Sequence, residues 1–403
     1  RPQGRGRRLG RHGLTERNES SRHHPAHVRS LSALAGRNRL RRLVHNEGWD
    51  LSSNDYLGLA GSAELRDEFM QAMASGAAMG SGGSRLLRGN HRAHTRLEEE
   101  AADLFGAEAS LYFSSGFLAN AAVFSTLPQR GDIVVYDALI HASVHDGMRL
   151  SRAESAGAAH NDVAAFEDEI VQWRRRGGTG RPWLAVESLY SMDGDAAPLD
   201  DLAALADRHD GIVVIDEAHA TGVLGPQGRG LGAHLEGRPN VISLHTCGKA
   251  LGLMGALLCA PRVLIDFLVN RCRPFIYTTS PSPLMAEAVR LALLRILSDE
   301  DIGRERRDEL RRRVGRVGAA LTKKCGFEPT GTHIQPIVVG RDARALELAE
   351  GLQKRGFDIR AIRPPTVPEG TARLRMSLTL NTPEGALLEF VDALAEEQEL
   401  MRS

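Results

Sequence analysis

Short apolar runs alternate with longer amphipathic stretches through the middle of this chain, and that alternation constrains the fold more than any other feature. We expect strands at 133–136, 183–187, 212–215, 241–245 and 256–260, and helices at 94–106, 116–127 and 200–211. Strands that alternate with helices predict an α/β fold with a mostly parallel central sheet covered by helices on both faces. Ligands of such sheets bind beyond the carboxyl ends of the strands.

The pattern changes after Pro283. A long charged helical stretch occupies 284–324, two strand patterns follow at 334–340 and 372–379 around a helical stretch at 343–356, and an amphipathic helix begins near Pro383. This mixture predicts a smaller C-terminal α+β domain over 284–403. We expect a large domain over 56–283 before it and an N-terminal arm over 31–55.

The start of the chain is basic and has no apolar periodicity. Residues 1–43 hold twelve arginines and no lysine, against Glu16 and Glu19. We expect a disordered leader over 1–30, native or foreign to the gene, with a helical pattern beginning near Leu31. An arginine-rich transit peptide or a nucleic-acid-binding arm is the alternative, although leucine and alanine are sparse in this segment. Nucleic-acid binding has no other support in the chain.

Cysteine spacing and hydropathy narrow the class of protein further. No run reaches the roughly 20 apolar residues that span a bilayer, so we expect no membrane insertion. The four cysteines show neither a CxxC pair nor metal-ligand spacing: Cys247, Cys259, Cys272 and Cys325. We therefore expect reduced thiols, no metal site and a cytoplasmic protein.

Two segments place reactive side chains directly after expected strands. Asp216 and His219 follow the apolar run at 212–215 in "DEAHATGVLG", and Lys249 lies in "TCGKALG" behind the run at 241–245. A lone lysine after a strand is most often a solvated charge, but three small neighbours leave room here for a flat ligand at the amine: Gly248, Gly252 and Gly255. One crossover separates the two strands, so both strand ends can face one cleft.

Pyridoxal phosphate suits this pair of groups. Its aldehyde condenses with a lysine amine, and an acid at the ring nitrogen keeps the ring protonated as an electron sink. Lys249 and Asp216 match these two needs. His219 could donate to the phenolic oxygen of the ring, or it could make only a local hydrogen bond at the start of a helix.

Two further segments could hold the phosphate and the ring. "FSSGFLAN" places Ser115, Gly116 and Phe117 at the start of a helical pattern, where backbone N–H groups bind phosphate well. His141 follows another expected strand, and its ring could cover the pyridine. Taken singly, each signal has an ordinary alternative, namely a common turn and a capped loop histidine.

Seven motifs in this order resemble the α-oxoamine synthases. They are "SSNDYLGLA", "GSGGSRLLRGNHRAHTRLEEE", "SSGFLAN", "IHASVHDG", "YSMDGDAAPL", "DEAHATGVLGPQGRG" and "HTCGKALG". Members of that family are fold type I pyridoxal-phosphate-dependent transferases that condense an amino acid with an acyl thioester and release carbon dioxide. The resemblance covers residue 31 to the C-terminus. The segments at 160–163 and 362–379 are similar to the branch that condenses L-alanine with pimeloyl-CoA or pimeloyl-acyl carrier protein in biotin biosynthesis.

The resemblance implies roles for individual residues around the cofactor. Lys249 would hold it and move protons, Asp216 would pair with the pyridinium, and His219 and His141 would contact the ring. The remaining cofactor positions are Gly116, Phe117, Ser191, Thr246, Thr278 and Thr279. The two threonines at 278 and 279 match a stretch that reaches the phosphate of the neighbouring subunit, which implies a homodimer with active sites at its interface.

The resemblance also implies substrate contacts. Arg375 would clamp the amino-acid carboxylate through two parallel hydrogen bonds, for which a guanidinium is better suited than an ammonium. Asn54, Thr366 and Arg41 match substrate-side positions, although Thr366 lies among prolines and could be turn chemistry, and the segment from Arg41 to Asn54 is short for the family. Arg373 precedes Arg375 in the same strand pattern, and we expect one of the two to face solvent.

Three other functions remain open from the sequence. A sister synthase would use glycine with another acyl-CoA, and a pocket found to accept the methyl group of alanine would argue against it. An aminotransferase would share the lysine and the aspartate but would need no thioester site. A cofactor-binding subunit without catalysis would be expected to lack one or more of five residues that this chain retains: His141, Asp216, His219, Lys249 and Arg375.

Overall fold

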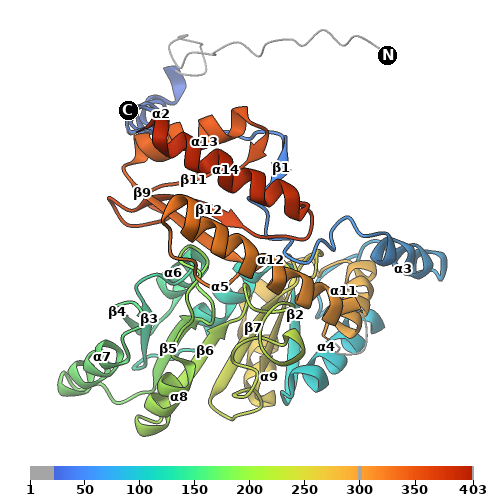
Figure 1. Ribbon diagram of the computed structural model, residues 1–403. Helices are drawn as coiled ribbons and strands as arrows, with labels where there is room; N and C mark the ends of the chain where they lie inside the picture. The colour runs from blue at the N-terminus through green and yellow to red at the C-terminus, as the bar shows by residue number, and fades with distance from the viewer. Residues whose placement is uncertain (1–21, 298–301, 402–403) are drawn as a thin grey trace.

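A computed structural model describes residues 22–297 and 302–401 (Figure 1). Most of the expected leader over 1–30 lies outside the described residues. The described part contains helix α2 (Pro25–Gly36), which begins before the expected start at Leu31 and has no buried residue. A proline in the first turn suits this start, because its ring fixes φ at a helical value and the first turn needs no N–H partner.

The center of the molecule is a seven-stranded sheet with the strand order β2-β8-β7-β6-β5-β3-β4. Strands β3 to β7 pair in parallel, whereas β8 lies antiparallel between β7 and β2, so the expectation of a mostly parallel sheet is confirmed. The bounds are β2 (Ala109–Phe113), β3 (Ile133–Asp137), β4 (Glu154–Ala158), β5 (Pro182–Glu187), β6 (Ile212–Asp216), β7 (Val241–Thr246) and β8 (Ala256–Ala260). The sequence analysis missed β2 and β4.

Helices cover both faces of this sheet, because successive strand residues point to opposite sides. Val134, Ala185 and Val214 pack in one core with residues of α5, α6 and α9, whereas Val135 and Leu184 pack in another with residues of α7 and α8. Strands with both faces buried need near-continuous apolar sequence, as these have. The helices are α4 (Arg92–Phe105), α5 (Gly116–Thr126), α6 (Ala142–Leu150), α7 (Val163–Arg175), α8 (Leu199–Arg208), α9 (Arg262–Arg271) and α10 (Arg273–Ile276), with a 3-10 turn η1 (Pro226–Gly228).

The C-terminal elements stack against one end of the central sheet (Figure 1). Their own antiparallel sheet has the order β11-β12-β9, and a short parallel pair joins β1 in the N-terminal arm to β10. The bounds are β1 (Trp49–Asp50), β9 (Ile334–Gly340), β10 (Phe357–Asp358), β11 (Ala361–Ile362), β12 (Ala372–Ser377), α12 (Ile302–Cys325), α13 (Asp342–Lys354) and α14 (Glu384–Leu400). Helix α11 (Pro283–Ile296) packs mainly on α3 (Ala63–Ala74) and α4 and also contacts α12.

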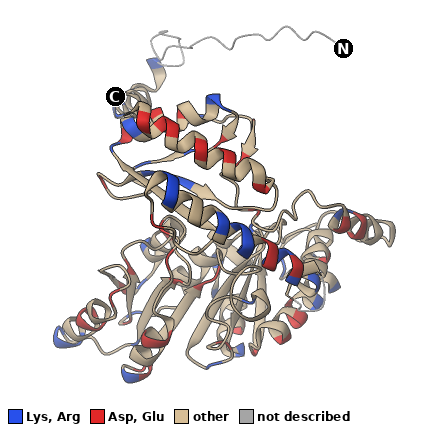
Figure 2. Ribbon diagram, in the orientation of Figure 1, with Lys and Arg blue, Asp and Glu red and all other residues tan. Residues whose placement is uncertain are grey.

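Three carboxylates mark one edge of the central sheet. The neighbouring strands β3, β5 and β6 are uncharged up to their last residue, which is Asp137, Glu187 and Asp216 respectively. Figure 2 shows most charged residues on helices and loops, away from the central strands. Because the three strands are parallel, their carboxyl ends meet at one edge, and Glu187 pairs directly with Asp216 in the sheet register.

Candidate active site

A chain of hydrogen bonds starts at Lys249, in the turn after β7. Its Nζ lies 2.8 Å from Nε2 of His219, and the other ring nitrogen of His219 lies 2.6 Å from the hydroxyl of Tyr56. That hydroxyl also lies 3.0 Å from Oδ1 of Asn54 and accepts from Nη2 of Arg375 at 3.0 Å. The chain therefore joins the ends of two central strands to the N-terminal arm and to β12.

One arrangement of protons satisfies every contact in this chain. A protonated Lys249 donates to Nε2 of His219, Nδ1–H of His219 donates to Tyr56, and Tyr56 donates to Asn54. It requires a neutral imidazole, and burial, followed by the positive charge of Lys249, holds the pKa of His219 well below its ordinary value. The hydrogen-bond network thus assigns the proton of His219 to Nδ1.

Two opposing effects act on the pKa of the Lys249 amine. Burial lowers its pKa from 10.5 to about 8, while the charges of Asp216 and Glu187 act in the opposite direction. An amine whose pKa lies near neutrality is present in both forms at working pH, which suits nucleophilic attack and proton transfer. The side chain is half-buried and so remains accessible.

Asp216 anchors a second chain of hydrogen bonds. Its Oδ1 accepts from the backbone N–H of Ala218 at 2.9 Å, and its Oδ2 accepts from Asn120 at 2.7 Å. Asn120 also donates to Oγ of Ser143, whose hydroxyl lies 2.7 Å from Nδ1 of His141. The hydroxyl therefore donates to Nδ1, the ring proton of His141 lies on Nε2, and burial lowers the pKa of this imidazole.

The start of α5 meets the end of β7. Ser115 caps the helix by accepting from Leu118 N–H, and among the described residues the N–H groups of Gly116 and Phe117 have no acceptor. A Cβ at Gly116 would lie 2.6 Å from Oγ1 of Thr246, so a larger residue here would require the Thr246 side chain to move. The ring of Phe117 lies edge-on to that of His141, with centroids 6.3 Å apart. The structure thus brings these four predicted cofactor residues together.

The expectation that Arg373 or Arg375 faces solvent is wrong. Both are buried, with 4% and 7% of their surface exposed. Residues two apart in a strand share a face, so the strand pattern never separated them. Arg373 pairs with Asp193, whereas Arg375 donates to the carbonyl of Ser191, to Ser377 and to Tyr56. Arg375 and Ser191 therefore lie with the Lys249 chain.

Arg41 and Thr366 lie together in a separate cavity. Nη2 of Arg41 donates to Oγ1 of Thr366 at 3.2 Å, and both line a cavity of about 210 Å³. Arg39, which is ion-paired with Asp342 and Glu369, and Arg363 also line this cavity. Ile362, also in the wall, pairs with the residue two before Arg375, so the cavity lies beside the strand that carries the buried arginines.

Two predicted residues lie outside these clusters. Thr278 and Thr279 follow α10, and no hydrogen bond among the described residues links either to Lys249 or Asp216. The next residue, Ser280, ties this loop to the motif that begins at Gly80 by donating to the carbonyl of Gly89 at 2.7 Å. Residues 22–297 and 302–401 also hold no cluster of three or more metal-ligating side chains, and no helix in them has the length and hydropathy to cross a bilayer.

Comparison with known proteins places this geometry in a family. The model of the aminotransferase class I and II family matches residues 46–394. The 8-amino-7-oxononanoate synthase of Chromobacterium violaceum is 45% identical over 332 residues, which cover 81% of this chain and 83% of that protein. That of Anaeromyxobacter dehalogenans is 43% identical over 354 residues, covering 86% and 85%. The chain belongs to the 8-amino-7-oxononanoate synthase family.

Solved structures agree with this family. The 8-amino-7-oxononanoate synthase of Francisella tularensis matches with a TM-score of 0.73 at 25% identity, covering 88% of this chain and 99% of that one. A Sphingomonas wittichii serine palmitoyltransferase matches with a TM-score of 0.82 at 25% identity, covering 95% and 98%. A structure of SPT with PLP matches with a TM-score of 0.78 at 25% identity, covering 87% of each chain. The fold type I transferase class expected from the sequence is confirmed.

Sequence reasoning overlooked three residues of the site in this 8-amino-7-oxononanoate synthase family member. Tyr56 lies within the quoted motif "SSNDYLGLA", yet only Asn54 was singled out. Asn120 lies one helical turn after Gly116, a spacing that places both on one face of α5. Glu187 ends a buried apolar strand just as Asp216 does, and the same signal could have found it.

The burial of Lys249 predicts that its amine reacts at lower pH than an exposed lysine does, even without a bound cofactor. In cofactor-free protein, we expect the rate of reductive methylation at Lys249 to rise with pH and to level off above about 8, because the neutral amine is the reactive form. The chain holds only three other lysines, and the exposed Lys354 is the internal reference in the same digest. Peptide mass spectrometry measures both rates. A rise at Lys249 that continues to pH 10 would show that burial does not lower its pKa.

Proposed function

We propose that this chain condenses L-alanine with a pimeloyl thioester, carried by coenzyme A or acyl carrier protein, to give 8-amino-7-oxononanoate. A carbon–carbon bond forms between the α-carbon of alanine and the thioester carbonyl, the carbon–sulfur bond breaks to free the thiol, and the alanine carboxylate leaves as carbon dioxide. The observation that carries the proposal is the chain of hydrogen bonds that joins Lys249 to Arg375. It occurs in a family whose curated relatives are named 8-amino-7-oxononanoate synthase.

We propose pyridoxal 5'-phosphate as the cofactor, and the residues present fit it. When bound, it condenses with an amino group and spreads the negative charge that develops at the α-carbon of the substrate. Lys249 would hold its aldehyde, Asp216 its ring nitrogen and His219 its phenolic oxygen. His141 and Ser191 would flank the ring. The free N–H groups of Gly116 and Phe117, beside Thr246, form the start of a helix that suits the phosphate.

Lys249 is the group we assign to proton transfer at the α-carbon of alanine. A pKa of about 8 leaves part of the amine unprotonated at neutral pH, so that Nζ can accept a proton and return it. Neutral His219 lies 2.8 Å from that nitrogen and restricts where it points. His141 is also placed to protonate a carbonyl oxygen, since its ring proton lies on Nε2, whereas the ring proton of His219 is donated to Tyr56.

Arg375 is the group we assign to the substrate carboxylate. Three of its nitrogens are directed by Ser191, Tyr56 and Ser377, which leaves a guanidinium fixed in one orientation with N–H groups to spare. Asn54 lies at the end of the same chain and would contact the substrate side. Fixing the carboxylate sets which bond at the α-carbon breaks.

The remaining assignments concern the thioester and a second subunit. Arg41 and Thr366 would contact an anionic part of the thioester substrate, because their cavity carries three arginines. We propose a homodimer in which Thr278 and Thr279 reach the phosphate of the neighbouring site, since no hydrogen bond among the described residues ties them to Lys249 or Asp216. The four free cysteines are consistent with a cytoplasmic enzyme.

The function is tested by measuring free thiol after mixing holoprotein with pimeloyl-CoA and an amino acid. We expect thiol release with L-alanine and at least tenfold less with glycine. Release with glycine and another acyl-CoA alone would indicate a sister synthase. Transfer of the amino group to a keto acid without thiol release would indicate an aminotransferase.

Replacing Arg375 tests its role as a carboxylate clamp. In Arg375→Lys, we expect KM for L-alanine to rise about 10- to 100-fold, because a hydrogen bond to a charged group contributes about 1.5–3 kcal/mol and lysine cannot bind in two places. Arg373→Lys is the matched control, since it keeps the positive charge next to Asp193 two residues away. We expect that variant to change KM less than threefold. Steady-state kinetics at saturating pimeloyl-CoA measures both KM values. Equal changes in KM in the two variants would contradict the assignment of Arg375 to the substrate carboxylate.

A further inference from the structure

Glu187 has an incomplete set of partners for a buried carboxyl group. It is 3% exposed, its Oε2 accepts from the backbone N–H of Ser191 at 3.1 Å, and its Oε1 has no hydrogen-bond partner among the described residues. The other two strand-end carboxylates differ, since Asp137 and Asp216 each accept hydrogen bonds through both oxygens. Burial and then the neighbouring Asp216 raise the pKa of Glu187 to about 8, so its carboxyl is mostly neutral at pH 7.

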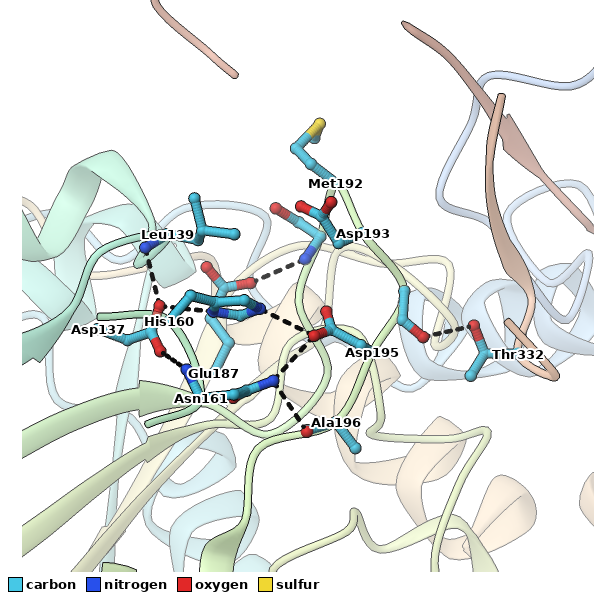
Figure 3. A network of polar contacts seen from close by, with 12 residues as sticks. Asp137, Leu139, His160, Asn161, Glu187, Met192, Asp193, Asp195, Ala196 and Thr332 are labelled. Atoms are coloured by element: carbon cyan, nitrogen blue, oxygen red, sulfur yellow. Dashed lines mark hydrogen bonds and ion pairs between the residues drawn. The ribbon is translucent and has the colours of Figure 1, made fainter. Parts of the chain in front are cut away.

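The residue that Glu187 holds begins a tight turn over 191–196. Figure 3 shows this turn beside His160, which lies between the carboxylates of Asp137 and Asp195 at 2.8 Å from each. Asn161 donates to Asp195 and to the carbonyl of Ala196. The far end of the turn is therefore fastened by His160 and Asn161, and the near end by Glu187.

The opposite side of the turn meets the C-terminal elements. Arg373 pairs with Asp193. Thr332 donates to the carbonyl of Gly194 at 3.2 Å (Figure 3). Gly194 has φ of +70°, and a Cβ there would lie 2.5 Å from the carbonyl oxygen of Ile334, so the turn and β9 are in direct contact. The turn is thus a fixed bridge between the central sheet and the C-terminal sheet, whose strand β12 carries the buried arginines.

The backbone of Ser191 connects Glu187 of the central sheet to Arg375 of the C-terminal sheet. Its N–H donates to Glu187, and its carbonyl accepts from Nε of Arg375. A change in the acceptor at 187 would let the Ser191 backbone rotate, and the carbonyl that directs the guanidinium would move with it. The effect on the substrate would be selective, since the amine and the carboxylate of alanine meet different groups.

We propose that Glu187 is a positioning residue that sets the direction of Arg375 through the backbone of Ser191, and thereby the recognition of the amino-acid carboxylate. This inference rests on the proposed function, in which Arg375 binds that carboxylate. Glu187 acts as a hydrogen-bond acceptor in this role, and its charge is not required. Glutamine, which keeps an acceptor oxygen at the same distance, should therefore replace it.

The test compares binding of L-alanine with binding of ethylamine, which is alanine without its carboxylate, to the holoprotein by titration calorimetry. In Glu187→Ala we expect the Kd for L-alanine to rise tenfold or more while that for ethylamine changes less than threefold. In Glu187→Gln we expect both to stay within threefold of the parent. Combining Glu187→Ala with Arg375→Ala should weaken alanine less than twofold beyond Arg375→Ala alone, because two residues that act through one interaction are not additive.

Each of the other outcomes would overturn a specific part of the proposal about Glu187. Equal weakening of both ligands in Glu187→Ala would show a general loss of site structure, and a Glu187→Gln variant as weak as Glu187→Ala would show that the carboxyl group acts as an acid. Additive effects on the free energy of L-alanine binding in the double variant would show that Glu187 does not act through Arg375. If Arg375→Ala leaves alanine binding unchanged, the proposed clamp itself fails, whatever Glu187 does. Should Glu187→Ala not fold, Glu187→Asp withdraws the acceptor by one methylene and is expected to give the same selective loss.

Discussion

The electrostatic balance at Lys249 is the constraint on which the rest of the site depends. Burial of an amine favours its neutral form, whereas nearby carboxylates favour the charged form. The parallel pairing of β5 with β6 places Glu187 directly beside Asp216, and both carboxylates raise the pKa of Lys249 against the effect of burial, Asp216 more strongly than Glu187. The result is an amine poised near neutral pH. Burial, followed by the neighbouring Asp216, raises the pKa of Glu187, and this limits how much negative charge the sheet edge carries.

The candidate active site contains residues from the C-terminal elements as well as from the central sheet. The ends of the central strands supply Lys249, Asp216 and His219, but the guanidinium of Arg375 comes from β12 and the hydroxyl of Tyr56 comes from the segment directly after the N-terminal arm. Tyr56 is the point where the three parts meet, since one hydroxyl contacts His219, Arg375 and Asn54. A site built across elements so distant in sequence keeps its geometry only while the turn at 191–196 and the arm hold their positions.

The predictable part of this structure follows from local chemistry. The strand ends that carry Asp216 and Lys249, and the glycine at the start of α5, were found because polar or small residues interrupt apolar runs there. Strand β4 was missed because "ESAGA" has no β-branched or aromatic residue, and β2 because it follows α4 with a three-residue connection. The error over Arg373 came from the strand period, which places both arginines on one face.

The unpredicted part depends on contacts between residues far apart in the chain. Nothing local to Tyr56 shows that it lies against a histidine 163 residues later, and nothing local to Ser191 shows that its carbonyl directs Arg375. The most direct test of the central claim follows the carboxylate carbon of L-alanine, labelled with carbon-13, in a reaction with pimeloyl-CoA. The account predicts that all label from consumed alanine leaves as carbon dioxide, in a one-to-one ratio with free thiol. Label that remains in a keto acid, or carbon dioxide released without thiol, would contradict it.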